Sequence, residues 1–344
     1  MRTAMGALVV VLALVTLGNP VAVAQPPAQP QNSVGSGLLQ TVAGLPPIQA
    51  LAEITRQLFG PDGRYIPWAR QLPPLPVPHT PQATPCPSGG PECITHVIQE
   101  MQRRGREMID ACSDNAPMLL SYLTATRATQ NITGSPGEFE DPAFLRNWDL
   151  QFADYYFRAL DDYYHGRRDA VPGAWRQAFQ AADTHSVTVL ADAVLGYNAH
   201  ITRDLPFVIA DIGVTAPDGT SRKRDHERAS QMLTEYQHQV LTALTGMYED
   251  ADPTMRAGAN LEPMVYMSFT QVIQAWREYA WRAAEQLLLA PTPADRAAVA
   301  DQIENLSQTL SQIIVQLFTR NDPPPHQGPC AKPTAELDRE LGQA

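Results

Sequence analysis

The spacing of apolar residues from Glu92 onward is the feature that most constrains the fold of this chain. Apolar side chains recur three and four positions apart, and no stretch keeps the alternation of a half-buried strand. This pattern predicts one all-α domain over residues 92–322, built from about seven to eight helices. The expected helices are 92–112, 116–129, 142–165, 173–182, 184–204, 222–250, 261–290 and 293–320.

Local signals at the helix ends support these boundaries. Asp141-Pro142 and Thr292-Pro293 combine a capping side chain with a proline in the first turn, and Gly166 follows the end of a helix. The helix expected over 261–290 carries large apolar residues on more than one face. We therefore expect it to be the central, mostly buried helix.

The N-terminus has the features of a secretory signal peptide. Arg2 precedes an apolar run, and Ala22-Val23-Ala24 places small residues before a cleavage site. The run is too short to cross a bilayer, and no later segment reaches 18 uninterrupted apolar residues. We expect residues 1–24 to be removed and the mature protein to be secreted or held in the cell envelope without a stable membrane anchor.

Proline sets the character of the regions on either side of the helical domain. Residues 25–91 contain 15 of the 31 prolines, which predicts an extended Pro/Gln-rich linker, interrupted by one short helix near 48–59. Residues 323–344 are expected to form a Pro-rich tail. The formal net charge of −11 leaves no basic excess for nucleic acid or an anionic lipid surface, so the partner is left as an unknown small molecule or envelope component.

Four cysteines are an even set for an oxidising compartment, and they allow three pairings. Cys86 and Cys93 flank a short Gly- and Pro-containing turn that suits a small loop. This choice leaves Cys112 to pair with Cys330. A zinc site is disfavoured, because it needs two tight cysteine pairs and the chain has one loose pair.

The densest group of polar residues lies in the helix expected over 184–204. Asp192, Gly196, His200 and Asp204 are each four residues apart, so they form one stripe on a helix. Glycine is unfavourable within a helix, which suggests that another group approaches closely at Gly196. His200 and Asp204 can direct an imidazole and a carboxylate to one point, as helical zinc hydrolases do.

A structural interpretation of the same residues is open. Pro206 disfavours helix at the residue before it, so the helix is expected to end near Asp204. Asp204 would then cap a short helix over 205–212, and His200 would offset the dipole of a helix C-terminus.

His226 is a third candidate ligand, because a charged imidazole is disfavoured in the first turn of a helix and a neutral one can bind a metal. His185 is 15 residues from His200, or about 22 Å along a helix, and is expected to make a cap or an interhelix hydrogen bond instead. Asp162-x-x-His165 and Glu235-x-x-His238 have the spacing of di-iron ligands, but exposed helix faces are the expected alternative. No nucleophile motif or phosphate-binding loop is present.

Residues 198–206 (Asn-Ala-His-Ile-Thr-Arg-Asp-Leu-Pro) and 217–226 resemble an actinobacterial family of unknown function, the domain-of-unknown-function family 5995. The stretches that begin at Tyr155 and Trp175 are also similar, and the resemblance covers about residues 95–320. It implies an α-helical domain from mycobacteria or their relatives and no particular activity. A weaker resemblance is to the helical zinc-dependent phospholipase C and P1 nuclease class. The chain departs from that class, because Gln25 stands where a ligating Trp would begin the mature protein and a full ligand set is missing.

Two functions follow from these residues. In the first, a divalent metal such as zinc is held by His200, Asp204 and His226 and activates water for hydrolysis. Asp225 would act as base or orienting group, Arg203 would hold an anionic group of the substrate, and Asn198 would orient the substrate or His200. In the second, the protein is a non-catalytic envelope or secreted protein, and these polar residues form a buried network that fixes helix packing.

Overall fold

The computed structural model describes residues 73–80, 83–135, 137–248, 250, 252, 262–320, 330–332 and 334–342. In these ranges the structure is all-α, as the apolar spacing predicts, and the only strand-like features are two isolated bridges, Val187–Thr319 and Thr215–Ser221. The helices are α5 (Glu92–Asp110), α6 (Ala116–Thr133), α7 (Pro142–Tyr164), η1 (Arg168–Ala170), α8 (Gly173–Thr184), α9 (Val189–Asn198), η2 (Ala199–Asp204), α10 (Leu205–Ile212), α11 (Lys223–Tyr248), α13 (Glu262–Leu289), α14 (Pro293–Phe318) and α15 (Ala335–Glu340).

Most of the predicted helices are found with small changes at their ends. The side chain of Asp141 accepts a hydrogen bond from the Phe144 amide at 2.9 Å, and this bond begins α7. Thr292 caps α14 in the same way through the Asp295 amide. The capping signals in the sequence are therefore used as predicted.

The predicted start of the helix over 184–204 is wrong. The preceding helix, α8, continues to Thr184 and ends at His185, which has a left-handed backbone with φ 50°. Thr188 then caps a separate helix, α9, by accepting a hydrogen bond from the Ala191 amide. Two helix ends thus fall within a stretch that the sequence pattern treated as one helix.

At the other end, the boundary at Asp204 and the short helix over 205–212 are found as expected, but the chain stays helical between them. A π-helical turn, η2, joins α9 to α10, and the Leu205 amide donates to the His200 carbonyl five residues earlier. Pro206 cannot donate to the chain, and its ring would clash with a carbonyl in a regular α-helix. The wider π turn accommodates this proline. Asp204 makes no side-chain cap bond to α10.

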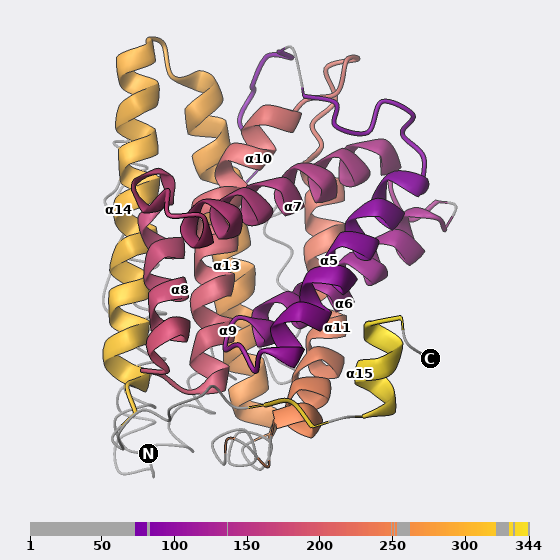
Figure 1. The fold of residues 1–344 in the computed structure, drawn as a ribbon. Helices are drawn as coiled ribbons and strands as arrows, with labels where there is room; N and C mark the ends of the chain where they lie inside the picture. The colour runs from indigo at the N-terminus through magenta and orange to yellow at the C-terminus, as the bar shows by residue number, and fades with distance from the viewer. Residues whose placement is uncertain are drawn as a thin grey trace, which may run out of the picture.

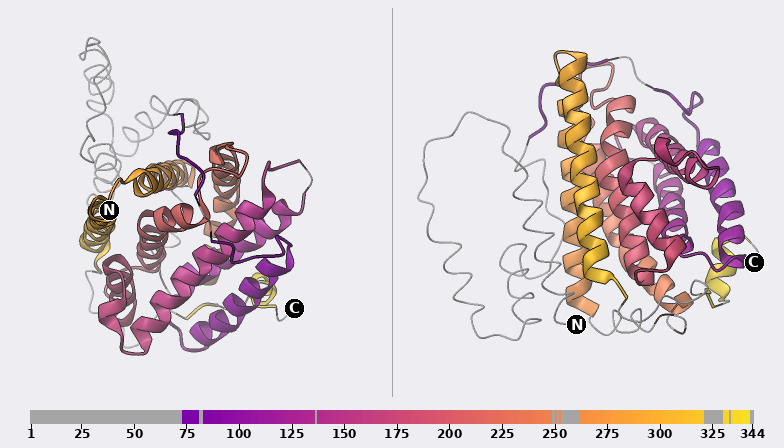
Figure 2. Two further views of the ribbon diagram at one scale, coloured as in Figure 1. Left: turned by 90° about the horizontal axis from the view of Figure 1, so that it is seen from above. Right: turned by 60° about the vertical axis from the view of Figure 1, so that its left-hand side comes forward.

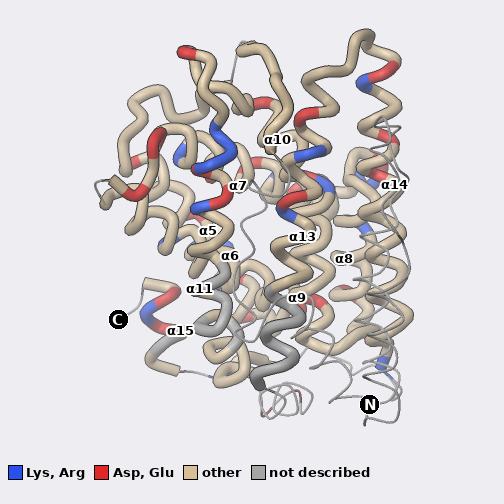
Figure 3. Tube along the Cα trace, turned by 180° about the vertical axis from the view of Figure 1, so that it is seen from behind, with Lys and Arg blue, Asp and Glu red and all other residues tan. Residues whose placement is uncertain are grey.

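The helices pack around α13, whose residues from Val272 to Leu287 include Trp276, Ala280 and Trp281, each at most 1% exposed. α7 lies across the upright helices, and α14 stands at one side of the body against α8 and α9 (Figures 1 and 2). Acidic and basic residues alternate along α13 (Figure 3), where buried Lys223 from α11 pairs with Glu278 and Arg282 bonds the same carboxylate. The prediction of α13 as the central helix is confirmed for its described side chains.

The two ends of the described chain both lie against the helices. Residues 73–80 have no regular secondary structure, and the Leu75 amide donates to buried Glu285 on α13 at 2.9 Å. The predicted tail over 323–344 contains a helix, α15, which the proline content did not predict; Arg127 on α6 donates to its carbonyl groups. The predicted signal peptide and the helix near 48–59 lie outside the described residues.

Both disulfides have the predicted pairing. Cys86 is joined to Cys93, and Cys112 is joined to Cys330 across 218 residues of sequence. The second bond ties the C-terminal segment to the loop between α5 and α6. Two disulfides indicate an extracellular or otherwise oxidising location. None of the helices described is long and apolar enough to cross a membrane.

Candidate functional site

His200 lies in the π turn and is buried among aromatic rings. Its imidazole stacks on Phe152 with ring centroids 3.3 Å apart, and the Tyr122 ring meets it edge-on at 4.4 Å. Neither ring nitrogen has a hydrogen-bond partner among the described residues. Burial, with a smaller contribution from the Arg277 charge, lowers the pKa of His200 well below its usual range. The imidazole is therefore neutral at pH 7.

His200 lines a cavity of about 100 Å³ between α6, α7, η2, α11 and α13. We call it the aromatic cavity; it is lined by Met118, Ser121, Tyr122, Ala125, Thr129, Leu145, Trp148, Asp149, Phe152, Tyr197, His200, Ile201, Ala229, Leu233, Tyr236, Val240, Ile273 and Arg277. Three further lining residues carry buried polar atoms for which the described part of the chain offers no partner. They are the Tyr122 hydroxyl, the Trp148 indole N–H and Oδ2 of Asp149.

Asp149 is the most unusual of these groups, because it lies on a largely apolar face of α7 and is only 7% exposed. Burial raises the pKa of its carboxyl group to about 8. The group is therefore mostly protonated at pH 7 and offers an O–H donor as well as an acceptor. Unsatisfied buried polar groups cost free energy, so their concentration around one cavity points to a molecule that completes them.

Asp204 and Arg203, two of the sequence-predicted site residues, form a different, satisfied network. The Trp175 indole N–H donates to Asp204 Oδ2 at 2.6 Å, and the Arg203 guanidinium donates to Asp204 Oδ1 at 2.9 Å. Arg203 also donates to Glu304 on α14 at 3.1 Å. These bonds connect η2 to α8 and α14.

Asn198 belongs to the same buried network. Its amide donates to the Ser307 carbonyl at 2.8 Å and to the Ser311 hydroxyl at 2.9 Å, both on α14. The Thr202 hydroxyl donates to the Asn198 carbonyl groups of backbone and side chain, each at 2.7 Å. A buried polar network of the kind expected in the second sequence interpretation is thus present.

The three predicted metal ligands do not converge. His200 Nδ1 lies 4.0 Å from Asp204 Oδ2, which agrees with their spacing on one helix. His226 instead stacks on Trp148 at 5.6 Å and contacts Trp281 at 5.0 Å. Within the described ranges, no group of three or more His, Cys, Asp or Glu side chains is placed to hold a metal ion.

The remaining predicted residues have structural contacts. Asp225 accepts hydrogen bonds from the backbone amides of Glu140 and Asp141 at 2.9 and 2.7 Å, so its carboxylate supports the loop before α7. A side chain at Gly196 would collide with Met118 on α6, which explains the glycine within α9. The close approach expected at this position is therefore a helix contact.

The first pair with di-iron spacing, Asp162 and His165, makes other contacts. Asp162 pairs with Arg167 at 2.7 Å, and Nδ1 of exposed His165 lies 2.7 Å from the carbonyl of Asp161 in its own helix. The side chains of Glu235 and His238 lie outside the described residues.

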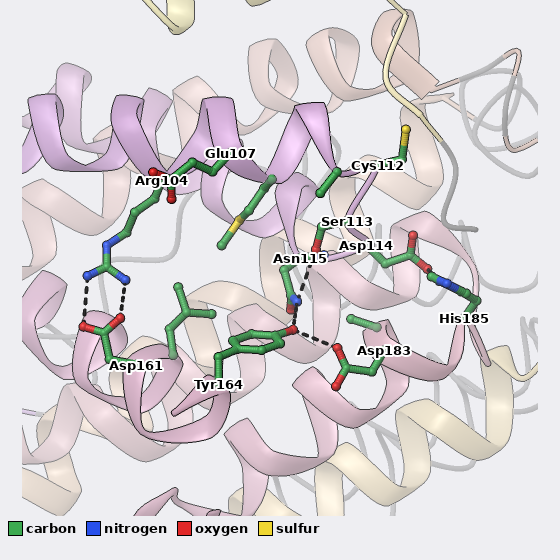
Figure 4. Close-up of a pocket in the computed structure, with 14 residues that line it drawn as sticks. Arg104, Glu107, Cys112, Ser113, Asp114, Asn115, Asp161, Tyr164, Asp183 and His185 are labelled. Atoms are coloured by element: carbon green, nitrogen blue, oxygen red, sulfur yellow. Dashed lines mark hydrogen bonds and ion pairs between the residues drawn. The ribbon is translucent and has the colours of Figure 1, made fainter. Parts of the chain in front are cut away.

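A larger hollow of about 570 Å³ lies between α5, α7 and α8 (Figure 4). Figure 4 shows Arg104 paired with Asp161, and Tyr164 placed between Asn115 and Asp183. These polar groups bond to one another. At its edge, Nδ1 of His185, the residue that follows α8, lies 2.9 Å from Asp114 in the loop between α5 and α6. The larger hollow therefore lacks the concentration of unsatisfied groups that marks the aromatic cavity.

Sequence reasoning found His200 and missed Tyr122, Asp149 and Arg277. A signal for Asp149 exists, because Leu145, Trp148, Asp149 and Phe152 share one helix face and a lone carboxyl among apolar residues is costly there. Tyr122 and Arg277 gave no such signal, since their role depends on how α6 and α13 pack.

The fold and the buried polar groups define an all-α, disulfide-containing domain with a network at η2 and a neighbouring cavity. Residues 94–317 match the family described as "Family of unknown function (DUF5995)". The chain belongs to this family, as its resemblance at residues 198–226 predicts. Comparisons with curated proteins and with solved structures found no match. They lend no support to the phospholipase C and P1 nuclease likeness or to an actinobacterial source.

Proposed function

We propose that this DUF5995 domain is a binding protein for a small, largely apolar molecule, which it holds in the aromatic cavity. One observation carries the proposal: polar atoms of four residues around a single cavity are buried and have no partner among the described residues. The four residues are Tyr122, Trp148, Asp149 and His200. Ligand sites combine apolar walls with a few convergent polar groups, and this cavity has both features.

A binding experiment tests the proposal with benzene as an apolar probe. Benzene at 100 times its Kd should raise the free energy of unfolding by about 2.7 kcal/mol, because it binds only the folded protein. Ala125→Leu adds bulk to the cavity wall and should abolish this stabilisation. Ala294→Leu makes the same change at an exposed position of α14 and serves as the matched control. An equal stabilisation of the wild type and Ala125→Leu would contradict the proposal.

A metal-dependent hydrolase is the second candidate, supported by the 4.0 Å approach of His200 to Asp204. The residues present do not fit a metal well, because both Asp204 oxygens already accept hydrogen bonds and His226 lies beside Trp148 and Trp281. We derive no hydrolytic step from this pair. Stoichiometric zinc in wild-type protein and its loss in His200→Ala would favour the hydrolase over the binding protein.

Export is part of the proposal. The two disulfides support an oxidising compartment, and the signal-peptide pattern supports cleavage after Ala24. N-terminal sequencing of the secreted protein should begin at Gln25. An uncleaved chain in the membrane fraction would contradict export as a free protein.

A further inference from the structure

We propose that the ligand of the aromatic cavity is a neutral molecule with a single aromatic ring and a hydroxyl group, that is, a member of the phenol class. This inference rests on the proposed function and specifies the chemistry of the same site. It follows from the size of the cavity, the nature of its walls and the lining polar groups for which the described part of the chain offers no partner.

Size limits the ligand to a few non-hydrogen atoms. The cavity holds about 100 Å³. An apolar cavity of roughly 150 Å³ binds benzene in an engineered protein. One six-membered ring is therefore close to the upper limit, and a fused ring system or a long acyl chain exceeds it.

The walls favour an aromatic ring over an alkyl one. Tyr122 and Phe152 meet edge-on with centroids 5.9 Å apart, and Trp148 lies next to Phe152 at 6.4 Å. Aromatic rings gain about 0.5–1.5 kcal/mol from edge-to-face and offset contacts beyond the area they bury. A saturated ring of the same size buries its surface without this gain.

The unpartnered atoms call for a group that both donates and accepts. A neutral His200 offers one N–H donor and one nitrogen acceptor, and the Tyr122 hydroxyl offers both functions. The Trp148 indole adds a further donor. A hydroxyl group satisfies donors and acceptors together, whereas benzene leaves all of them unpaired.

Charge argues against an ionised ligand. Arg277 lines the cavity, so a cation meets the guanidinium, and the protonated carboxyl group of Asp149 supplies no negative charge to balance it. The guanidinium is already engaged, since it lies 4.8 Å above the Trp148 ring and donates to Ser230 at 2.7 Å. Burying a charged group without a dedicated partner is costly, which favours a neutral molecule.

Calorimetric titration of the full chain at pH 7 with phenol, benzene, cyclohexanol and benzoate tests the ligand class. Phenol should bind about tenfold more tightly than benzene, equivalent to one good hydrogen bond. Cyclohexanol should bind several-fold more weakly than phenol, and benzoate should not bind.

Two matched variants connect this preference to the cavity. Tyr122→Phe removes one lining hydroxyl and should weaken phenol binding about five- to tenfold while leaving benzene binding unchanged. Tyr156→Phe removes a hydroxyl that is also buried and unpartnered among the described residues but does not line the cavity, so it should leave phenol binding unchanged. Asp149→Leu is a second lining variant; it removes both the donor and the acceptor of the carboxyl group and is expected to act like Tyr122→Phe.

The outcomes separate the ligand class from the proposed function. Equal affinities for phenol and benzene, or tighter binding of benzoate or cyclohexanol, overturn the phenol class and leave a small-molecule site in place. A loss of phenol binding in Tyr156→Phe as large as that in Tyr122→Phe also overturns it. Failure of all four probes to bind overturns both the class and the proposed function.

Discussion

Buried polar side chains in this domain fall into two groups, which differ in whether their polar atoms form hydrogen bonds. Asn198 and Asp204 are fully buried, and their oxygen or nitrogen atoms are bonded to neighbouring helices. His200 and Asp149 are almost as buried, yet polar atoms of both lack partners within the described chain. The first pair stabilises helix packing, whereas the second carries a cost that a bound molecule would remove. This contrast between neighbouring residues locates the candidate site.

The bond between Trp175 and Asp204 gives a prediction for single residues. Trp175→Phe leaves a buried carboxylate oxygen without its donor, and Asp204→Asn removes the charge that faces Arg203. Each change should lower the free energy of unfolding by about 1–3 kcal/mol. Because both break one network, the double variant should cost less than the sum by at least about 0.5 kcal/mol.

Urea unfolding of the wild type, the two single variants and the double variant measures this coupling. Tyr156→Phe combined with Asp204→Asn is the control, because the Tyr156 hydroxyl bonds to no described residue. Strict additivity of Trp175→Phe and Asp204→Asn would refute the network.

The secondary structure could be predicted from sequence wherever local chemistry decides it. Asp141 and Thr292 bond to amides three residues ahead, so α7 and α14 begin where the sequence indicates. Continuation through Pro206 depends instead on a π turn held among α13 and α14, which no local pattern encodes. The aromatic cavity could not be predicted from the sequence for the same reason. Its polar groups come from separate helices, and spacing along one helix cannot reveal that they meet.

The C-terminal helix gives a prediction at the level of an element. Arg106 and Arg127 donate to carbonyl groups of residues 339–341, and the Cys112–Cys330 disulfide fixes the segment before α15. Replacing both cysteines by serine should speed amide exchange in α15 and leave α7 and α13 protected, because the core packs without the disulfide. The chain-entropy value for so long a loop is about 5 kcal/mol, an upper estimate of the stability lost.

Hydrogen exchange followed by mass spectrometry measures this local effect. The Cys86→Ser/Cys93→Ser variant opens a loop of only seven residues' separation and should leave exchange in α15 unchanged. Loss of protection throughout the helices of Cys112→Ser/Cys330→Ser, at equal native circular dichroism, would show that α15 is part of the core.

Over the whole molecule, buried titratable groups make stability depend on pH in two directions. Burial lowers the pKa of His200 and His226 well below that of an unfolded histidine. Unfolding therefore takes up protons below about pH 6.5, and their contribution to stability is lost as pH falls. Burial raises the pKa of Asp149 to about 8 and that of Asp192 well above its ordinary range. These two carboxyl groups release protons on unfolding, so stability falls as pH rises.

The interval from pH 7 to pH 8 reports mainly on the carboxyl groups, because histidines with an ordinary pKa near 6.5 are mostly deprotonated there in both the folded and the unfolded state. Asp149 alone should lower the free energy of unfolding by about 1 kcal/mol over this interval, and Asp192 should act in the same direction. Asp149→Asn and Asp192→Asn should each flatten the pH dependence, and the double variant should remove most of it. Asp301→Asn, at an exposed position of α14, should leave the slope unchanged.

Urea unfolding at pH 7.0, 7.5 and 8.0 measures the slopes. A wild-type slope equal to that of the double variant would mean that these carboxyl groups are already ionised in the folded protein. The ligand class would then be wrong, because it depends on a neutral, hydrogen-bonding Asp149.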